Sequence, residues 1–289
     1  MAISLTLGGE RPKIKREGNV GYVLPALAII AIFFVVPVLM LLIRSVLEPQ
    51  LGLQNYAALL GSTTYLRIFL NTFIVAGVAT VVSVLLGYPV AWLLAIMPER
   101  WSRLVLAIIV LSMWTNLLAR TYAWMVLLQR TGVVNKTLIG LGLIDKPLAL
   151  VNNLIGVTIG MTYIMLPFMI LPLLSAMRSI DPTVLRAASV LGANPLRQFI
   201  HVYLPLSMPG VSAGAALVFI TSLGFFITPA LLGGAENTMI AVLIEQQANR
   251  LLNWPLASAL ATILLAITTV LYLLYERVSR RVGGAGVFG

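Results

Sequence analysis

Residues 181–209 read Asp181-Pro-Thr-Val-Leu-Arg-Ala-Ala-Ser-Val-Leu-Gly-Ala-Asn-Pro-Leu-Arg-Gln-Phe-Ile-His-Val-Tyr-Leu-Pro-Leu-Ser-Met-Pro209 and separate two long apolar runs. Asp181 suits a helix N-cap because its carboxylate can accept the free N–H groups of the first turn. Pro182 then occupies the first helical position, where no N–H is needed. Gly192 can adopt the left-handed conformation that ends a helix. The segment therefore begins with a short predicted helix.

A second short helix is predicted in the same segment. Asn194-Pro195 repeats the start signal, and Pro205 is its predicted end. Small and apolar side chains share one face of the first helix: Val184, Ala187, Ala188 and Leu191. A short helix with such a face is suited to lie in a groove of another protein.

This segment resembles the cytoplasmic motif of the inner-membrane permeases of ATP-binding-cassette importers. The family motif has Glu-Ala-Ala, three residues, Gly, nine residues, and then Ile-x-Leu-Pro. Here Arg186-Ala187-Ala188 precedes Gly192 at that spacing, and Val202-Tyr203-Leu204-Pro205 follows it. Arg186 replaces the family Glu. The resemblance extends over 22–281, and Thr228-Pro-Ala-Leu-Leu-Gly-Gly is similar to the spermidine/putrescine branch.

The resemblance implies a function and a set of partners. In the family this segment is the coupling helix, which docks into the ATPase subunit. It assigns coupling within 181–205 to seven residues: Asp181, Arg186, Ala187, Ala188, Gly192, Leu204 and Pro205. It also implies a different second permease, two ATPase subunits that hold ATP and Mg, and a periplasmic or extracellular substrate-binding protein. The implied activity is ATP-driven alternating access for a polyamine.

Composition places the chain in a lipid bilayer. Of 289 residues, 60% are hydrophobic and 10% are charged, whereas soluble domains carry about 25% charged residues. The net charge of +10 would suggest nucleic acid on a soluble protein, but here Lys and Arg are better explained as markers of cytoplasmic loops. We expect no nucleic-acid partner. The absence of cysteine excludes disulfides.

An all-α polytopic membrane protein with six transmembrane helices is predicted, because a helix needs about 20 apolar residues to cross a bilayer. Six stretches qualify: 22–47, 68–97, 104–128, 148–177, 208–232 and 255–278. We expect a single transmembrane domain over 1–289, with a six-span core at 22–278 and tails at 1–21 and 279–289. Segment 129–147 is predicted to be irregular, and 238–252 to contain a short helix.

The distribution of positive charge predicts the orientation. With the N-terminus inside, twelve Lys and Arg fall on cytoplasmic parts and seven elsewhere. The twelve are Arg11, Lys13, Lys15, Arg16, Arg100, Arg103, Arg178, Arg186, Arg197, Arg277, Arg280 and Arg281. This arrangement puts both termini and 181–209 in the cytoplasm. The expected location of the protein is the inner membrane of a bacterium.

No catalytic constellation, metal site or cofactor site is predicted. Among the six predicted spans, Asp and Glu occur only as Glu276, near the end of the last one, which argues against a gradient-driven carrier with a proton relay deep in the membrane. The chain has no phosphate-binding loop, so ATP hydrolysis would need a separate subunit. Two alternatives stay open: an importer of the same class for another small solute (amino-acid derivative, opine or iron), and a gradient-driven secondary carrier.

Aromatic residues near the predicted spans are candidates for contact with a cation: Tyr88, Trp92, Trp114, Tyr122, Trp124 and Tyr163. Of these, Trp92, Trp114, Tyr122 and Tyr163 are the predicted substrate-path residues. Trp and Tyr also gather at membrane interfaces, which is the competing explanation. Two pairs of small residues, Gly156/Gly160 and Gly210/Gly214, predict close helix contacts, either between subunits or within the chain.

Overall fold

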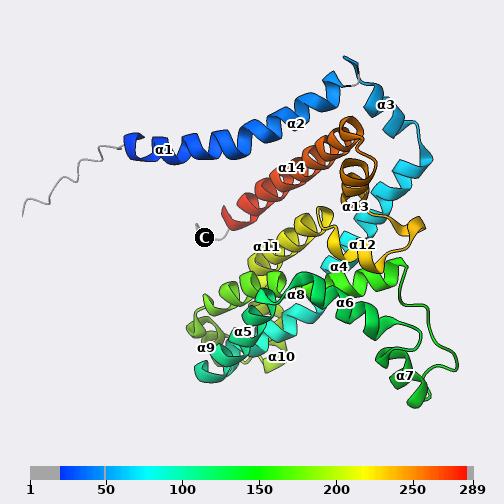
Figure 1. Ribbon diagram of the computed structural model, residues 1–289. Coiled ribbons are helices and arrows are strands. Elements are labelled where there is room, and N and C mark those ends of the chain that lie inside the picture. The colour runs from blue at the N-terminus through cyan, green and yellow to red at the C-terminus, as the bar shows by residue number, and fades with distance from the viewer. Residues whose placement is uncertain (1–19, 49, 285–289) are drawn as a thin grey trace, which may run out of the picture. The chain divides into compact units, whose positions relative to one another are not determined.

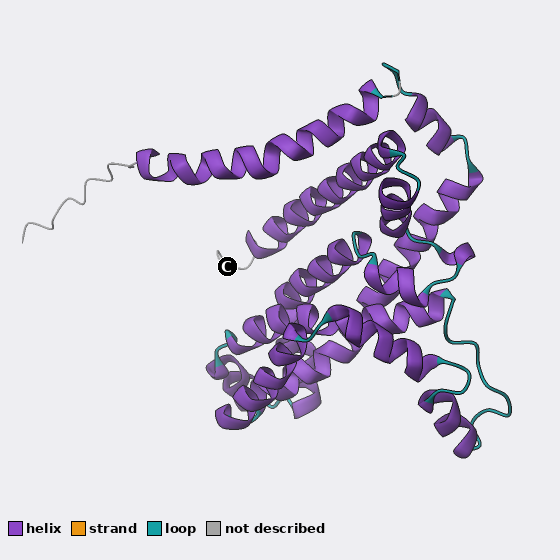
Figure 2. Ribbon diagram, viewed as in Figure 1, coloured by secondary structure: helices purple, strands orange, loops and turns teal. Residues whose placement is uncertain are grey.

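The computed structural model describes residues 20–48 and 50–284, and all regular structure in these residues is helical (Figure 2). The chain divides into two compact units, Met1–Ile43 and Arg44–Gly289. Most of the two predicted tails, with the basic residues at 11–16, lies outside the described residues.

The first unit contains an apolar helical segment that covers most of the first predicted span. Helix α1 (Val20–Ile30) continues through a π-helical turn (Ala31–Val35) into α2 (Val36–Leu47), whose last residues belong to the second unit. The turn includes Phe33, whose carbonyl has no α-helical donor because Pro37, four residues later, lacks an N–H. Residues Leu24–Leu47 are apolar and long enough to cross a membrane.

The second unit is built around α8 (Leu154–Arg178), which packs against α4 (Thr63–Ile96) on one side and α11 (Leu204–Leu223) on another (Figure 1). Met161, Met165 and Leu173 of α8 are fully buried. A Cβ on Gly210 of α11 would lie 3.1 Å from Leu173 Cα. The two predicted small-residue pairs therefore serve contacts within this chain.

A second core joins α3 (Gln54–Leu60) and the start of α4 to α13 (Ile240–Glu245) and α14 (Trp254–Gly284). Leu59, Ile240 and Leu260 are fully buried there. Thr72 Oγ1 accepts a 2.8 Å hydrogen bond from Ile240 N. The helix predicted within 238–252 is thus present, followed by a π turn (Gln246–Arg250), and its apolar face is covered by the chain itself.

Within the described residues, five helical stretches are long and apolar enough to cross a membrane, and a bent pair brings the number to as many as six. The prediction of one continuous third span at 104–128 was wrong. Helices α5 (Glu99–Trp114) and α6 (Leu117–Leu128) belong to a pair bent by 96°. The break has a local cause: Asn116 Oδ1 accepts the N–H groups of Leu118 and Ala119 and so starts a new helix.

Two further expectations need correction. The fifth predicted span, 208–232, ends at Leu223, and Gly224 separates it from the short helix α12 (Ile227–Leu232). The segment predicted to be irregular, 129–147, contains α7 (Val133–Gly140). Buried Asn135 stabilises this segment, because its Nδ2 donates to the carbonyls of Gln129 and Leu148.

Candidate functional site at the 181–205 segment

The segment begins with α9 (Pro182–Val190), which directly follows α8. Asp181 is its N-cap, as predicted, and accepts a 2.8 Å hydrogen bond from Thr183 N. That backbone hydrogen bond is the main reason why the pKa of Asp181 lies below its usual range; the Thr183 side chain and the charge of Arg186 act in the same direction. The cap therefore stays ionised at neutral pH and holds the first turn.

Gly192 ends α9 in the left-handed conformation, with a φ of +82°. Its N–H donates to Ser189 C=O at 3.0 Å, and Ala193 N–H donates to Ala188 C=O at 3.0 Å. These bonds satisfy carbonyls that the last helical turn leaves free. The helix stop predicted at Gly192 is confirmed.

The predicted end at Pro205 was wrong. Helix α10 (Pro195–Gln198) begins at the predicted Asn194 cap, and a π turn (Phe199–Tyr203) carries it into α11 without a break. Pro205 lacks an N–H for the carbonyl of His201, and the π turn includes that residue. Leu204 and Pro205 thus lie inside one long helix.

Two hydrogen bonds tie α10 to α9 and to the turn between them. Gln198 Nε2 donates to Ser189 Oγ at 2.9 Å and to Ala193 C=O at 2.8 Å. The turn between the helices exposes a large apolar surface, which we call the apolar tip: Val190 (87% exposed), Leu191 (87%) and Leu196 (66%). Of the predicted contact residues, Arg186 and Ala187 are exposed, whereas Ala188 is half-buried.

A polar contact at the base of the segment links α8 to α5. Arg178, three residues before Asp181, donates through Nη2 to Ser102 Oγ at 2.6 Å. Ser102 in turn donates to Leu94 C=O at 2.7 Å, a carbonyl that Pro98 cannot serve because it lacks an N–H. Ser102 is buried. This contact was not predicted, since Arg178 is far from Ser102 in the sequence.

Replacing Ser102 should loosen this base. We expect Ser102→Ala to cost about 1–3 kcal/mol, because the Leu94 carbonyl is left without its donor in a buried position. Thermal unfolding of the purified complex measures the loss. Ser179→Ala is the matched control, since in the described part of the chain Ser179 Oγ bonds only to Ala176 C=O of its own helix. Equal unfolding temperatures for the two variants would contradict the assignment.

Four aromatic rings pack where the segment meets α4. Phe199 lies edge-on to Tyr88 (6.0 Å between ring centroids) and Trp92 (5.9 Å), and is stacked on Tyr203 (6.1 Å). Tyr88 Oη lies 2.9 Å from Ser207 Oγ of α11. Trp92, predicted to contact substrate, therefore belongs to the contact between α4 and the segment.

The other predicted substrate-path residues lie elsewhere. Tyr163 packs against Trp124 with ring centroids 5.4 Å apart. Trp114, at the break between α5 and α6, is 85% exposed, and Tyr122 is 48% exposed. No contact described in residues 20–48 and 50–284 joins these four predicted residues into one site.

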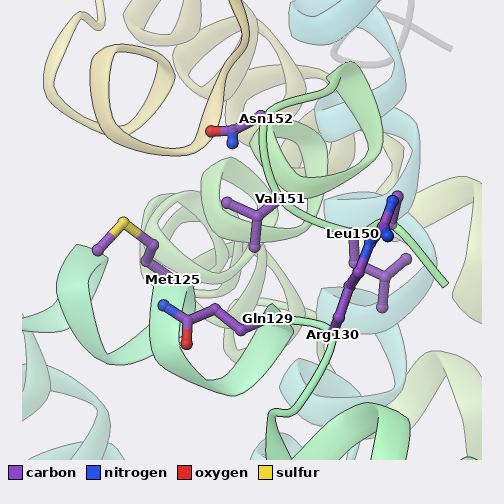
Figure 3. A pocket seen from close by; sticks show the side chains of 7 residues that line it. Met125, Gln129, Arg130, Leu150, Val151 and Asn152 are labelled. Atoms are coloured by element: carbon purple, nitrogen blue, oxygen red, sulfur yellow. The ribbon is translucent and has the colours of Figure 1, made fainter. Parts of the chain in front are cut away.

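A cavity of about 500 Å³ with a mixed polar and apolar lining lies at the other end of α8 from α9 (Figure 3). Gln129 and Arg130 line one side, and the segment 149–152 lines the other. Asn152 adopts a φ of +62° and donates through N to Leu232 C=O at 2.8 Å. A 25-residue helix is about 37 Å long, so this cavity and the apolar tip lie at opposite ends of the second unit.

The family model described as "Binding-protein-dependent transport system inner membrane component" matches residues 80–284. The chain belongs to this family. The permease is 38% identical to the spermidine/putrescine transport system permease protein PotB of Escherichia coli K12, over 79% of this chain and 82% of the relative. It is 34% identical to the inner membrane ABC transporter permease protein YdcU of the same organism, over 79% and 76%.

The solved structures agree with this fold. A bacterial alginate ABC transporter, crystallised with an alginate-bound periplasmic protein, matches with a TM-score of 0.74 and 19% identity over 91% of this chain and 94% of the other. The permease is therefore a multi-pass inner-membrane subunit of a binding-protein-dependent ABC importer. It is not an enzyme and carries no cofactor, since nucleotide is bound by the ATPase partner.

Proposed function

We propose that the permease imports a polyamine of the spermidine/putrescine type by ATP-driven alternating access. The observation that supports the substrate is the 38% identity to PotB, which is named for spermidine and putrescine. The capped helix α9 and its apolar tip support the coupling role. An exposed apolar surface of this kind needs a partner to cover it, and the ATPase subunit is the partner that we propose.

The proposed orientation puts the apolar tip and both termini in the cytoplasm. Arg178 and Ser102 share one end of the unit, so the basic residues at 100 and 103 lie at the same end as those at 186 and 197. A cluster of Arg at one membrane face is typical of the cytoplasmic side. We further propose one transmembrane domain over 1–289, a different second permease, two ATPase subunits and a substrate-binding protein.

In the proposed cycle, ATP binding brings the two ATPase subunits together and displaces the apolar tip. Gln198 makes α9 and α10 move as one piece. The displacement reaches α8 and α5 through Arg178 and Ser102, and α4 through the ring of Phe199. Only a difference in ATPase contacts between the two conformations can drive the change.

Uptake by the reconstituted complex tests the proposal. Proteoliposomes that hold both permeases and the ATPases should accumulate radiolabelled spermidine or putrescine only with ATP and the loaded binding protein. Accumulation of another solute recovered from the co-purified binding protein would overturn the substrate assignment. Uptake by this chain alone, collapsed by an uncoupler, would instead identify a gradient-driven carrier.

A further inference from the structure

The formally charged side chains nearest the apolar tip are both positive. Between residues 181 and 205 the residues with a formal charge at neutral pH are Asp181, Arg186 and Arg197. Asp181 caps the opposite end of α9, about 13 Å along the helix from Val190. Arg186 and Arg197 are exposed, and in the described residues neither guanidinium has a hydrogen bond or a salt bridge. The segment therefore presents two positive charges without a direct partner beside its apolar surface.

Both arginines belong to the same piece of structure as the tip. Arg186 lies about one helical turn before Val190, so the two side chains share a face of α9. Arg197 directly follows Leu196 in α10. The hydrogen bonds of Gln198 hold α9, α10 and the turn between them together. The apolar tip and the two charges thus form one surface, which meets a partner as a unit.

This combination determines what a covering surface must provide. When a partner covers the tip, water is removed from the guanidinium groups beside it, and a desolvated charge is costly unless it is paired. A guanidinium pairs best with a carboxylate, through two parallel hydrogen bonds. A location on the cytoplasmic side accounts for basic residues at this end of the unit in general, but it does not require them to lie beside the tip.

We propose that the ATPase subunit receives the apolar tip in a groove with an apolar floor and with Asp or Glu side chains at its rim, which pair with Arg186 and Arg197. The proposal rests on the coupling role proposed above. In such an interface the apolar contacts at the centre determine mainly how long the complex lasts, whereas the charges at the rim determine mainly how fast it forms and in which register. The two parts of the surface therefore predict different kinetic defects.

Binding of the ATPase to the permease complex stripped of it, in nanodiscs, separates the two parts. At about 50 mM salt, Arg186→Glu combined with Arg197→Glu should slow association at least about tenfold, and the wild-type rate should fall steeply by about 300 mM salt. Leu191→Ala should leave association within about twofold and speed dissociation about tenfold, because it removes apolar contact. Arg103→Glu, at the same end of the unit but on α5, is the matched control and should bind like the wild type.

Lipid composition tests the other source of negative charge. The same measurements in nanodiscs of phosphatidylcholine alone and in nanodiscs with added phosphatidylglycerol should give the same defect for the double variant. A defect confined to the nanodiscs with phosphatidylglycerol would assign the arginines to lipid headgroups and overturn the proposal. A wild-type association rate that does not change with salt would overturn it as well.

Coupling with a carbodiimide identifies the partner group directly. The reagent joins an amine to a nearby carboxylate as an amide, takes up the water that is lost, and does not couple a guanidinium. Arg186→Lys and Arg197→Lys keep the positive charge and supply the amine. Each should couple to an Asp or Glu of the ATPase, which mass spectrometry locates. Arg103→Lys is the control for the chemistry and should couple to Glu99 of its own helix, since the native pair is 3.3 Å apart.

The outcomes distinguish this inference from the proposed function. If the ATPase binds and only the Arg103→Lys control couples, the rim of the groove is not acidic and the inference is wrong, while the proposed function stands. If the ATPase does not bind the wild-type complex at all, the coupling role proposed for the tip is wrong, and this inference with it.

Discussion

Transport should fall at least tenfold in Gly192→Val, with the protein still inserted in the membrane. At its φ of +82°, a side chain costs about 1–2 kcal/mol, and a β-branched one is less favourable still. No atom lies within 4 Å of a Cβ built there, so the effect comes from the backbone and not from a clash. Relief of that strain would rotate the turn and misplace the apolar tip. Uptake and ATPase activity of the reconstituted complex measure the loss.

Three substitutions at Gly192 test whether the left-handed backbone conformation is the cause of the loss. Gly192→Asn should keep most of the transport, because Asn tolerates the left-handed conformation, and Gly192→Ala should fall in between. Gly140→Val is the matched control: the glycine also ends a short helix, has open space around it and has no positive φ. A Gly192→Val variant that transports like the wild type would rule out a role for the turn in coupling.

The second large effect is expected from Gly210→Ala. The new Cβ would lie 2.5 Å from Ala176 Cβ and 3.1 Å from Leu173 Cα, neither of which can move without its helix. Overpacking of this kind costs about 1–3 kcal/mol and would push α11 away from α8. Thermal unfolding of the detergent-solubilised complex should show the loss, together with reduced transport.

Two further variants make this prediction specific. Gly77→Ala is the control, since a Cβ at Gly77 of α4 meets nothing within 4 Å, and Ala favours a helix over Gly by about 1 kcal/mol. It should match or exceed the stability of the wild type. Adding Ala176→Gly to Gly210→Ala should restore part of the lost stability. If Gly77→Ala and Gly210→Ala behave alike, α8 and α11 do not meet as described.

Local chemistry is what made parts of this fold predictable. Asp181, Gly192 and Asn194 act on their own backbone neighbours, so their roles as caps and helix stop follow from sequence order. The apolar spans follow from composition. The prediction at Pro205 was wrong because a proline does not always end a helix. Here a π turn accommodates the missing N–H, and the proline alone does not indicate that such a turn will form.

Contacts between distant residues could not be predicted in this way. Nothing near Trp92 in sequence indicates that it meets Phe199, and nothing near Tyr163 indicates Trp124. Thr158 and Thr162 look equivalent in the sequence, yet only Thr162 is left without a hydrogen-bond partner in the described residues. The break at Asn116 did have a local signal, because Asn is a helix-capping residue and here it lies inside an apolar run. The prediction of the third span used only hydrophobicity and so missed it.

The claim that energy enters through the apolar tip has a direct test, because the chain contains no cysteine. Leu191→Cys, at a position that is 87% exposed, gives a single labelling site. A membrane-impermeant maleimide should label it in inside-out vesicles stripped of the ATPase, and the ATPase should block that labelling when it is added back. Labelling of intact cells from the outside, or labelling that the ATPase leaves unchanged, would contradict the account.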